Sequence, residues 1–101
     1  MKIISKELDP NIVTEEIFIV DWRVSNWRLL QTNVIGLARY SIFISASEIL
    51  NNVTPMWSRY RGLSTRNDNT IIQCPPNTTG IKFMVDQFDP GTLITINLIC
   101  I

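Results

Sequence analysis

Histidine is absent from this sequence, and its absence limits the chemistry that the chain can perform. Histidine is the commonest general base and metal ligand near neutral pH. Without it, the serine and cysteine triads are excluded in their usual form. Two cysteines cannot complete a zinc site unless carboxylates or another chain contribute ligands. We therefore expect no enzyme activity, no metal and no cofactor.

Glycine is scarce, and so is any excess of charge of one sign. The four glycines are well separated, so there is no glycine-rich phosphate loop and no dinucleotide-binding fingerprint. Nine basic residues balance nine acidic ones, which leaves no long-range field to attract nucleic acid or an anionic membrane. No apolar run reaches the roughly 18 to 20 residues that span a bilayer. We expect no nucleic-acid partner and no membrane insertion.

The composition is that of a folded domain. The chain has 101 residues, of which 46% are hydrophobic and 18% charged, whereas disordered chains have low hydrophobicity and high charge. A chain of this length holds one core. We expect a single domain over residues 1–101, with residues 1–15 as a candidate extended N-terminal arm.

The residues that are abundant favour β-structure. Ile, Val, Thr and aromatic residues suit the pleated, half-buried surface of a sheet, and turn residues recur at strand-like intervals. We predict an all-β fold, a small antiparallel β-sandwich (jelly-roll-like) of about six or seven strands. In the first part of the chain we expect strands at 16–24, 27–31, 34–46 and 53–60, a helical turn or loop at 47–52 and a polar loop at 64–69.

The C-terminal part predicts a three-stranded antiparallel meander from about Asn69 to the end. Residues 81–88 and 92–101 both alternate apolar with polar side chains, and Asp89-Pro90-Gly91 between them is a turn. A two-residue loop would pair apolar residues throughout, namely Val85 with Ile96, Phe83 with Leu98 and Ile81 with Cys100.

The same register predicts that the cysteines are free. It places Cys74 and Cys100 at one end of the meander, on one face and two strands apart. Strands lie about 4.8 Å apart, which separates the pair by roughly 10 Å. A disulfide needs Cα atoms within about 7 Å, so we expect buried thiols that act as small hydrophobes.

The segment Met56–Gly62 mixes aromatic residues with arginines. Such a patch could stack on sugars or bases or anchor a protein interface, and its candidate ligand or interface residues are Trp57, Arg59, Tyr60 and Arg61. The alternative is that Trp57 packs in the core while the arginines guard an edge strand.

Paired carboxylates are the remaining catalytic option. Asp86 and Asp89 are close in sequence, and Glu15 is adjacent to Glu16. A glycosidase needs two carboxyl groups that flank a cleft, which so small a domain rarely builds. The simpler interpretation places Asp86 on a solvated face and Asp89 at the start of a turn.

Apolar residues on the outer face of the last strand indicate self-association. Ile99 and Ile101 alternate out of the predicted core, and Met84 lies on the neighbouring strand of the meander. Three apolar side chains there would form an exposed patch on a monomer. We expect Met84, Ile99 and Ile101 to form an oligomer interface.

The stretch Leu37–Ile101 resembles the C-terminal head domains of bacteriophage tail or head fibres. The resemblance rests on the strand Tyr40–Ala46, the proline-containing loop and meander that follow, and the final strand Thr95–Ile101. It implies a trimeric β-sandwich on a virion surface that touches host glycans or decorates the capsid.

Three functions follow in order of preference. The first is a virion structural protein that acts by binding and self-assembly, as a fibre head, attachment component or capsid decoration. Its partners would be copies of itself (a homotrimer is favoured), other virion proteins and a host surface glycan. The second is a carbohydrate-binding module that uses exposed aromatics, and the third is a small carboxylate-dependent enzyme.

Overall fold

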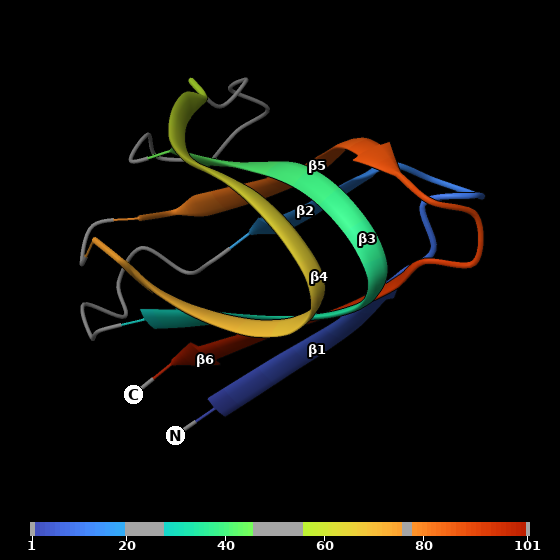
Figure 1. Ribbon diagram of the computed structural model, residues 1–101. Coiled ribbons are helices and arrows are strands. Elements are labelled where there is room, and N and C mark those ends of the chain that lie inside the picture. The colour runs from blue at the N-terminus through green and yellow to red at the C-terminus, as the bar shows by residue number, and fades with distance from the viewer. Residues whose placement is uncertain (1, 20–27, 46–55, 76–77, 101) are drawn as a thin grey trace.

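The computed structural model describes residues 2–19, 28–45, 56–75 and 78–100. These ranges form an antiparallel sheet of six strands and contain no helix, so the expected all-β class is confirmed. No helix in them is long and apolar enough to cross a membrane. The strands are β1 (Lys2–Leu8), β2 (Glu15–Ile19), β3 (Arg28–Ser45), β4 (Ser58–Cys74), β5 (Gly80–Phe88) and β6 (Leu93–Cys100) (Figure 1).

A long bent hairpin, β3–β4, organises the sheet. β4 pairs with β3 along nearly its whole length. The other edge of β3 is shared, because its first half (28–35) pairs with β6 and its second half (38–45) pairs with β5. β1 adds to β6 and β2 adds to β5. The hairpin therefore contributes strands to two layers that curve around one core, as Figure 1 shows.

The bend in the hairpin depends on two residues with left-handed backbone. Gly36 has a φ of 103° and lies where the β3–β4 register shifts between Val34 and Leu37. Asn67 on β4 has a φ of 47°, a conformation that Asn tolerates better than most residues. The Gly36 N–H donates to Oδ1 of Asn67 at 2.8 Å, so the side chain satisfies a donor at the irregularity.

Alternating side chains from both layers fill the core between them. Tyr40 and Phe83 stack with ring centroids 4.5 Å apart, and the Tyr40 hydroxyl lies 2.8 Å from the Thr32 hydroxyl. Burial of such side chains supplies the main stabilisation of a β-sandwich. The buried apolar set is Leu8, Phe18, Leu30, Val34, Ala38, Tyr40, Ile42, Ile72, Cys74, Ile81, Phe83, Val85, Ile94, Ile96 and Leu98.

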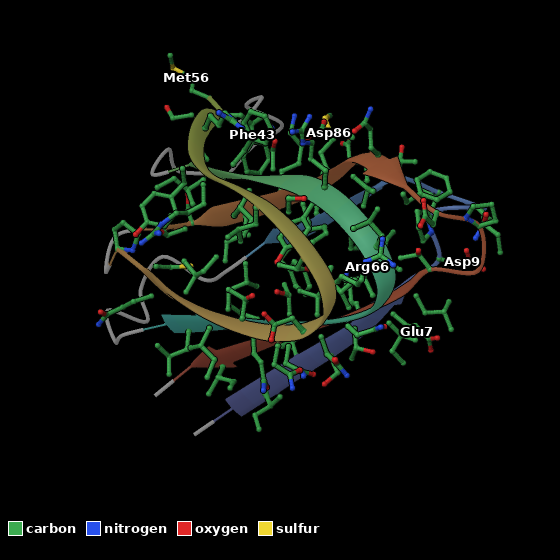
Figure 2. All side chains as sticks on the ribbon, viewed as in Figure 1. Glu7, Asp9, Phe43, Met56, Arg66 and Asp86 are labelled. Carbon is green, nitrogen blue, oxygen red and sulfur yellow. The ribbon has the colours of Figure 1, made fainter. Side chains whose placement is uncertain are left out.

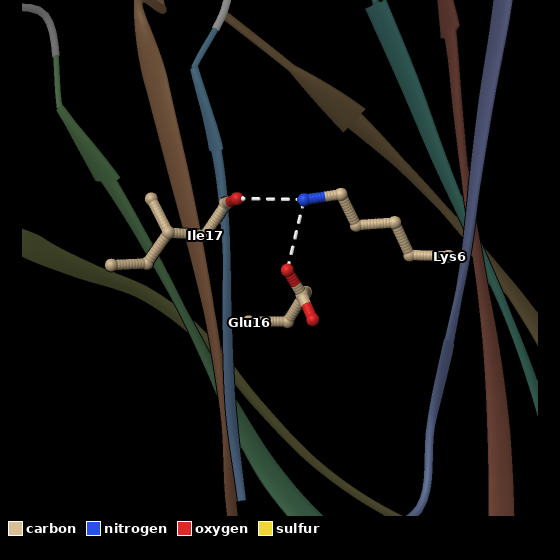
Figure 3. A network of polar contacts seen from close by, with 3 residues as sticks. All are labelled: Lys6, Glu16 and Ile17. Carbon is tan, nitrogen blue, oxygen red and sulfur yellow. Dashed lines mark hydrogen bonds and ion pairs between the residues drawn. The ribbon is translucent and has the colours of Figure 1, made fainter. Parts of the chain in front are cut away.

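Lys6 joins the layers on the side away from the bent hairpin. Its Nζ lies 2.9 Å from Oε1 of Glu16 and donates to the carbonyl oxygen of Ile17 at 3.2 Å (Figure 3). The same ammonium lies 4.9 Å from the centre of the Phe18 ring. β1 and β2 do not pair with each other, so these contacts bring their edges together and give a nearly closed barrel.

The predicted C-terminal meander is wrong. β5 pairs with β2 and β3, and β6 pairs with β1 and β3, so Ile81 does not face Cys100. The turn itself forms, since the Thr92 N–H donates to the Asp89 carbonyl at 3.2 Å and Gly91 has a φ of 85°. Tight two-residue hairpins need positive φ at the first central residue or at both, which Pro90 cannot adopt. The turn therefore sends β5 and β6 into different layers.

Three further expectations are corrected. Residues 64–69 belong to β4 rather than to a polar loop, because β4 is an outer strand whose solvated side accepts polar residues. The ranges 27–31 and 34–46 are not two strands, since β3 runs unbroken from 28 to 45. Residues 2–8 form β1 within the sheet instead of an arm. The expected turn at 47–52 lies outside the described residues.

The cysteines lie as far apart as predicted, for a different reason. Cys74 and Cys100 both pair with Arg28, from opposite sides of β3. Two strand spacings separate them by about 10 Å. Cys74 is fully buried in the core, as expected for a thiol that acts as a small hydrophobe.

Candidate binding site

The predicted aromatic and basic patch is divided by the structure. Trp57 is half-buried just before β4, and Arg59 is exposed on β4 opposite Phe43. Tyr60 packs against the core instead, and its hydroxyl donates to the Gln73 carbonyl at 2.8 Å. The Arg61 guanidinium lies 5.9 Å from the Tyr60 ring. The register shift between Ile42 and Phe43 separates Trp57 and Arg59 from Tyr60 and Arg61. The four residues therefore do not form one surface.

A groove lies on the outer face of the layer formed by β3, β4 and β5. Its volume is about 550 Å³, and it includes only Arg59 from the predicted patch. This volume is within the range of small-molecule sites, about 300–1,000 Å³. The lining residues are Arg39, Tyr40, Arg59, Gly62, Leu63, Ser64 and Asp86.

Strand register explains the hollow. Ser41 on β3 pairs with Gly62 on β4, so a short side chain lies beside a missing one. Arg39 pairs with Ser64 at one end of this small-residue row. Arg59 begins at the other end, and its guanidinium lies over Gly62, where a Cβ would collide with it. Gly62 therefore gives Arg59 room to extend into the groove.

Asp86 supplies the carboxylate of the groove. Its Oδ2 accepts a hydrogen bond from the Ser41 hydroxyl at 3.0 Å, which fixes the carboxylate on the outer face of the sheet. Figure 2 shows Asp86 and Phe43 pointing away from the interior on this side of the molecule. In the described part of the chain, no ion pair joins Arg39 or Arg59 to a carboxylate. Among the described residues, the groove thus has two guanidinium groups and one carboxylate.

A cation lies between two aromatic rings beside the groove. Lys82 Nζ lies 5.0 Å from the centre of the Phe43 ring and 5.4 Å from that of Trp57. Lys82 and Arg59 both pair with Phe43, from β5 and β4 respectively. This aromatic and cationic row therefore borders the groove at its Arg59 end.

The predicted oligomer residues are not brought together. Met84 lies on β5 and faces out of the layer that carries the groove, opposite Ser41. Ile99 lies on β6 and faces out of the other layer. Ile101 lies outside the described residues. β6 is also not an edge strand, since it lies between β1 and β3. The expectation assumed that β5 and β6 are neighbours, which they are not, so Met84 and Ile99 do not share one outer face.

The outer face of the other layer contains an apolar surface of which the sequence revealed only Ile99 among the described residues. Ile99 lies between Ile3 on β1 and Leu29 on β3, and Ile71 on β4 pairs with Gln31 in the next row. Ile3 is 53% exposed and Ile71 is 64% exposed. We call this the uncharged face, and its described outward residues are Ile3, Ser5, Glu7, Leu29, Gln31, Asn33, Ile35, Asn69, Ile71, Gln73, Leu93, Thr95, Asn97 and Ile99.

The carboxylates considered for catalysis do not form a cluster. Glu16 is held by Lys6, and Asp86 by Ser41. Asp89 accepts a hydrogen bond from the Thr92 N–H through its carbonyl in the turn. No group of three His, Cys, Asp or Glu residues suited to a metal occurs among the described residues.

Sequence reasoning missed most of the groove. Arg39, Gly62 and Ser64 carry no pattern that would single them out, and only the β3–β4 register makes them neighbours. Searches against protein-family models, curated proteins and solved structures find no match for this chain.

Proposed function

We propose that this chain is a virion structural protein that works by binding and self-assembly, as a fibre head, attachment component or capsid decoration. The observation that carries the proposal is the uncharged face of the β1–β6–β3–β4 layer. Of its described side chains only Glu7, at one end, is charged. Exposed branched aliphatic residues cluster on this face, and such patches on soluble proteins mark interaction sites.

The chemistry of this face favours a second copy of the same chain as its partner. Its polar residues include Ser5, Gln31 and Asn97, which form a row of hydrogen bonds across the strands. Hydroxyl and amide groups both donate and accept, so such a row can pair with a copy of itself. A face with almost no charge does not select an oppositely charged partner. It therefore suits a symmetric oligomer, and the resemblance to fibre heads implies three copies.

Light scattering coupled to size exclusion tests the self-assembly. Ile71→Lys places a charge in the middle of the uncharged face, and we expect it to shift the chain from oligomer to monomer. Ile12→Lys is the matched control, since Ile12 is 83% exposed in the turn after β1 and lies outside that face. A wild-type monomer at high concentration would contradict the proposal, as would dissociation by both variants alike. Sequencing the flanking genes tests the virion assignment, because capsid or tail genes are expected there.

A second candidate function is carbohydrate binding, and the groove on the opposite layer favours it. Hydrogen-bond donors and an acceptor surround a hollow that is bordered by Trp57 and Phe43. Sugars have hydroxyl groups that pair with such polar groups and apolar faces that pack on aromatic rings. Of the exposed aromatics first considered, Trp57 remains a candidate, whereas Tyr60 packs against the core. Glycan-array binding that is lost on Trp57→Ala with folding intact would support this function.

A further inference from the structure

The groove on the β3–β4–β5 layer carries a charge pattern that specifies its ligand further. Arg39 and Arg59 present two guanidinium groups without an ion-pair partner among the described residues, and Asp86 presents one carboxylate. The described lining of the groove therefore has a net charge of about one positive unit. This charge is complementary to a ligand with a single negative charge and less suited to a phosphate dianion.

The two arginines line one groove from different strands. Along β3, Arg39 and Ser41 are two residues apart, which corresponds to about 7 Å. The Arg59 side chain extends over Gly62, which pairs with Ser41. The guanidinium of Arg59 therefore lies nearer to the Arg39 end of the groove than the backbone of Arg59 does. Guanidinium groups bind carboxylates through two parallel hydrogen bonds, so this arrangement favours a carboxylate held from above Gly62.

Asp86 adds the second half of the specificity. An ionised carboxylate only accepts hydrogen bonds, so it needs hydroxyl or amine donors from the ligand. Its Oδ2 already accepts from Ser41, and lone pairs remain for a ligand hydroxyl. Ser64 adds a hydroxyl that donates or accepts at the Arg39 end. A polyol that carries one carboxylate complements all of these groups.

We propose that the groove binds a carboxylated sugar, a uronic or sialic acid residue within a glycan. Arg39 and Arg59 bind the carboxylate of the sugar, and Asp86 and Ser64 bind its hydroxyls. The next sugar of the glycan lies toward Trp57 and Phe43, outside the lining of the groove and beside the Lys82 ammonium. This inference rests on the carbohydrate-binding function proposed above and narrows it to acidic glycans.

The test uses a glycan array with galacturonate, glucuronate and sialic acid oligosaccharides, each beside its neutral counterpart, followed by calorimetry on the strongest acidic ligand. We expect the acidic glycan to bind, and its methyl ester to bind at least tenfold more weakly. Arg59→Gln should weaken binding about tenfold to a hundredfold, because a hydrogen bond to a charged group contributes about that much. Arg66→Gln removes the same charge from an exposed position of β4 outside the groove and should leave the affinity unchanged.

Gly62→Ala provides an independent arm, because the added methyl displaces the flexible Arg59 guanidinium and leaves the backbone of β4 in place. It should weaken binding as Arg59→Gln does, with unchanged thermal unfolding. Equal binding of acid and ester, or equal losses in Arg59→Gln and Arg66→Gln, would overturn the proposal. Displacement by inorganic phosphate at matching concentration would also overturn it, in favour of a phosphate site. Neutral glycans that bind in a Trp57-dependent way, with no preference for acidic ones, would overturn only this inference and leave carbohydrate binding intact.

Discussion

Replacing Gly36 with alanine should destabilise the protein far more than the same change at Gly91. Both glycines have positive φ, 103° and 85°, so a side chain strains the backbone at either position by roughly 1–2 kcal/mol. Their surroundings differ. A Cβ on Gly36 would lie 2.5 Å from Thr92 Oγ1 and 3.0 Å from Thr92 Cα, whereas one on Gly91 meets nothing within 4 Å.

Thr92 cannot move away without loss. Its hydroxyl donates to the Leu37 carbonyl at 3.1 Å, and the Leu37 N–H donates to the same hydroxyl at 3.3 Å. Thr92 is fully buried, so each broken bond costs about 1 kcal/mol. The clash therefore adds about 2 kcal/mol at Gly36, for a total of about 3–4 kcal/mol against about 1–2 kcal/mol at Gly91. The free energy of unfolding of domains of this size is roughly 5–15 kcal/mol, so Gly36→Ala should leave the protein close to unfolding.

Urea denaturation followed by tryptophan fluorescence measures both variants. The midpoint should fall at constant slope, and it should fall about two to three times as far for Gly36→Ala as for Gly91→Ala. A double-mutant cycle with Thr92→Ala isolates the clash, since Gly36→Ala should cost less once the hydroxyl is gone. Equal losses for the two glycine variants, or strictly additive losses in the cycle, would show that the close approach of β3 to Thr92 does not set the bend.

Two further predictions concern polar groups in the sandwich. Burial raises the pKa of the Tyr40 phenol, so the unfolded chain loses this proton first and the free energy of unfolding should fall as the pH rises above about 10. In Tyr60→Phe, Tyr40 is the one remaining tyrosine, and its phenolate absorbance should appear together with loss of tertiary circular dichroism. Titration of the folded protein near pH 10 would contradict this prediction. Lys6→Met should lower the free energy of unfolding by about 1 kcal/mol. A double-mutant cycle with Glu16→Gln should give a coupling energy of about 0.2–1 kcal/mol that declines with salt, because the pair is partly exposed. A coupling energy that does not change with salt would contradict the surface character of the contact.

The alternation of side chains could be read from the sequence, but strand pairing could not. Ile81, Phe83 and Val85 are buried as their spacing predicts, since period-two alternation is a local property. The predicted pairing of β5 with β6 matched apolar residues to one another. The observed structure also brings these apolar residues together, because the two strands line opposite sides of one core. Alternation places a side chain inside or outside, and it does not say which strand lies beside it.

The length of β3 is what the sequence concealed. A break was expected between residues 31 and 34, whereas β3 continues through them, and Gly36 provides a bend that lets this one strand serve both layers. Because the groove combines Arg39 from β3, Arg59 from β4 and Asp86 from β5, it appears only when this non-local arrangement is known. The apolar residues Ile3, Leu29 and Ile71 were likewise separated in sequence and joined by register.

The two outer faces of the sandwich are chemically different, and this difference predicts how they cooperate. The uncharged face lies on the β1–β6 side and the groove on the β2–β5 side, so copies that associate through the former direct their grooves outward. Outward grooves can bind several glycans at once, which multiplies the apparent affinity for a glycan-coated surface by about 100-fold or more. Ile71→Lys should therefore keep the affinity for a soluble glycan measured by calorimetry and lose most of the binding to a dense glycan surface. Arg59→Gln should lose both. If Ile71→Lys lowered the affinity for the soluble glycan as much as for the surface, the two faces would not be independent.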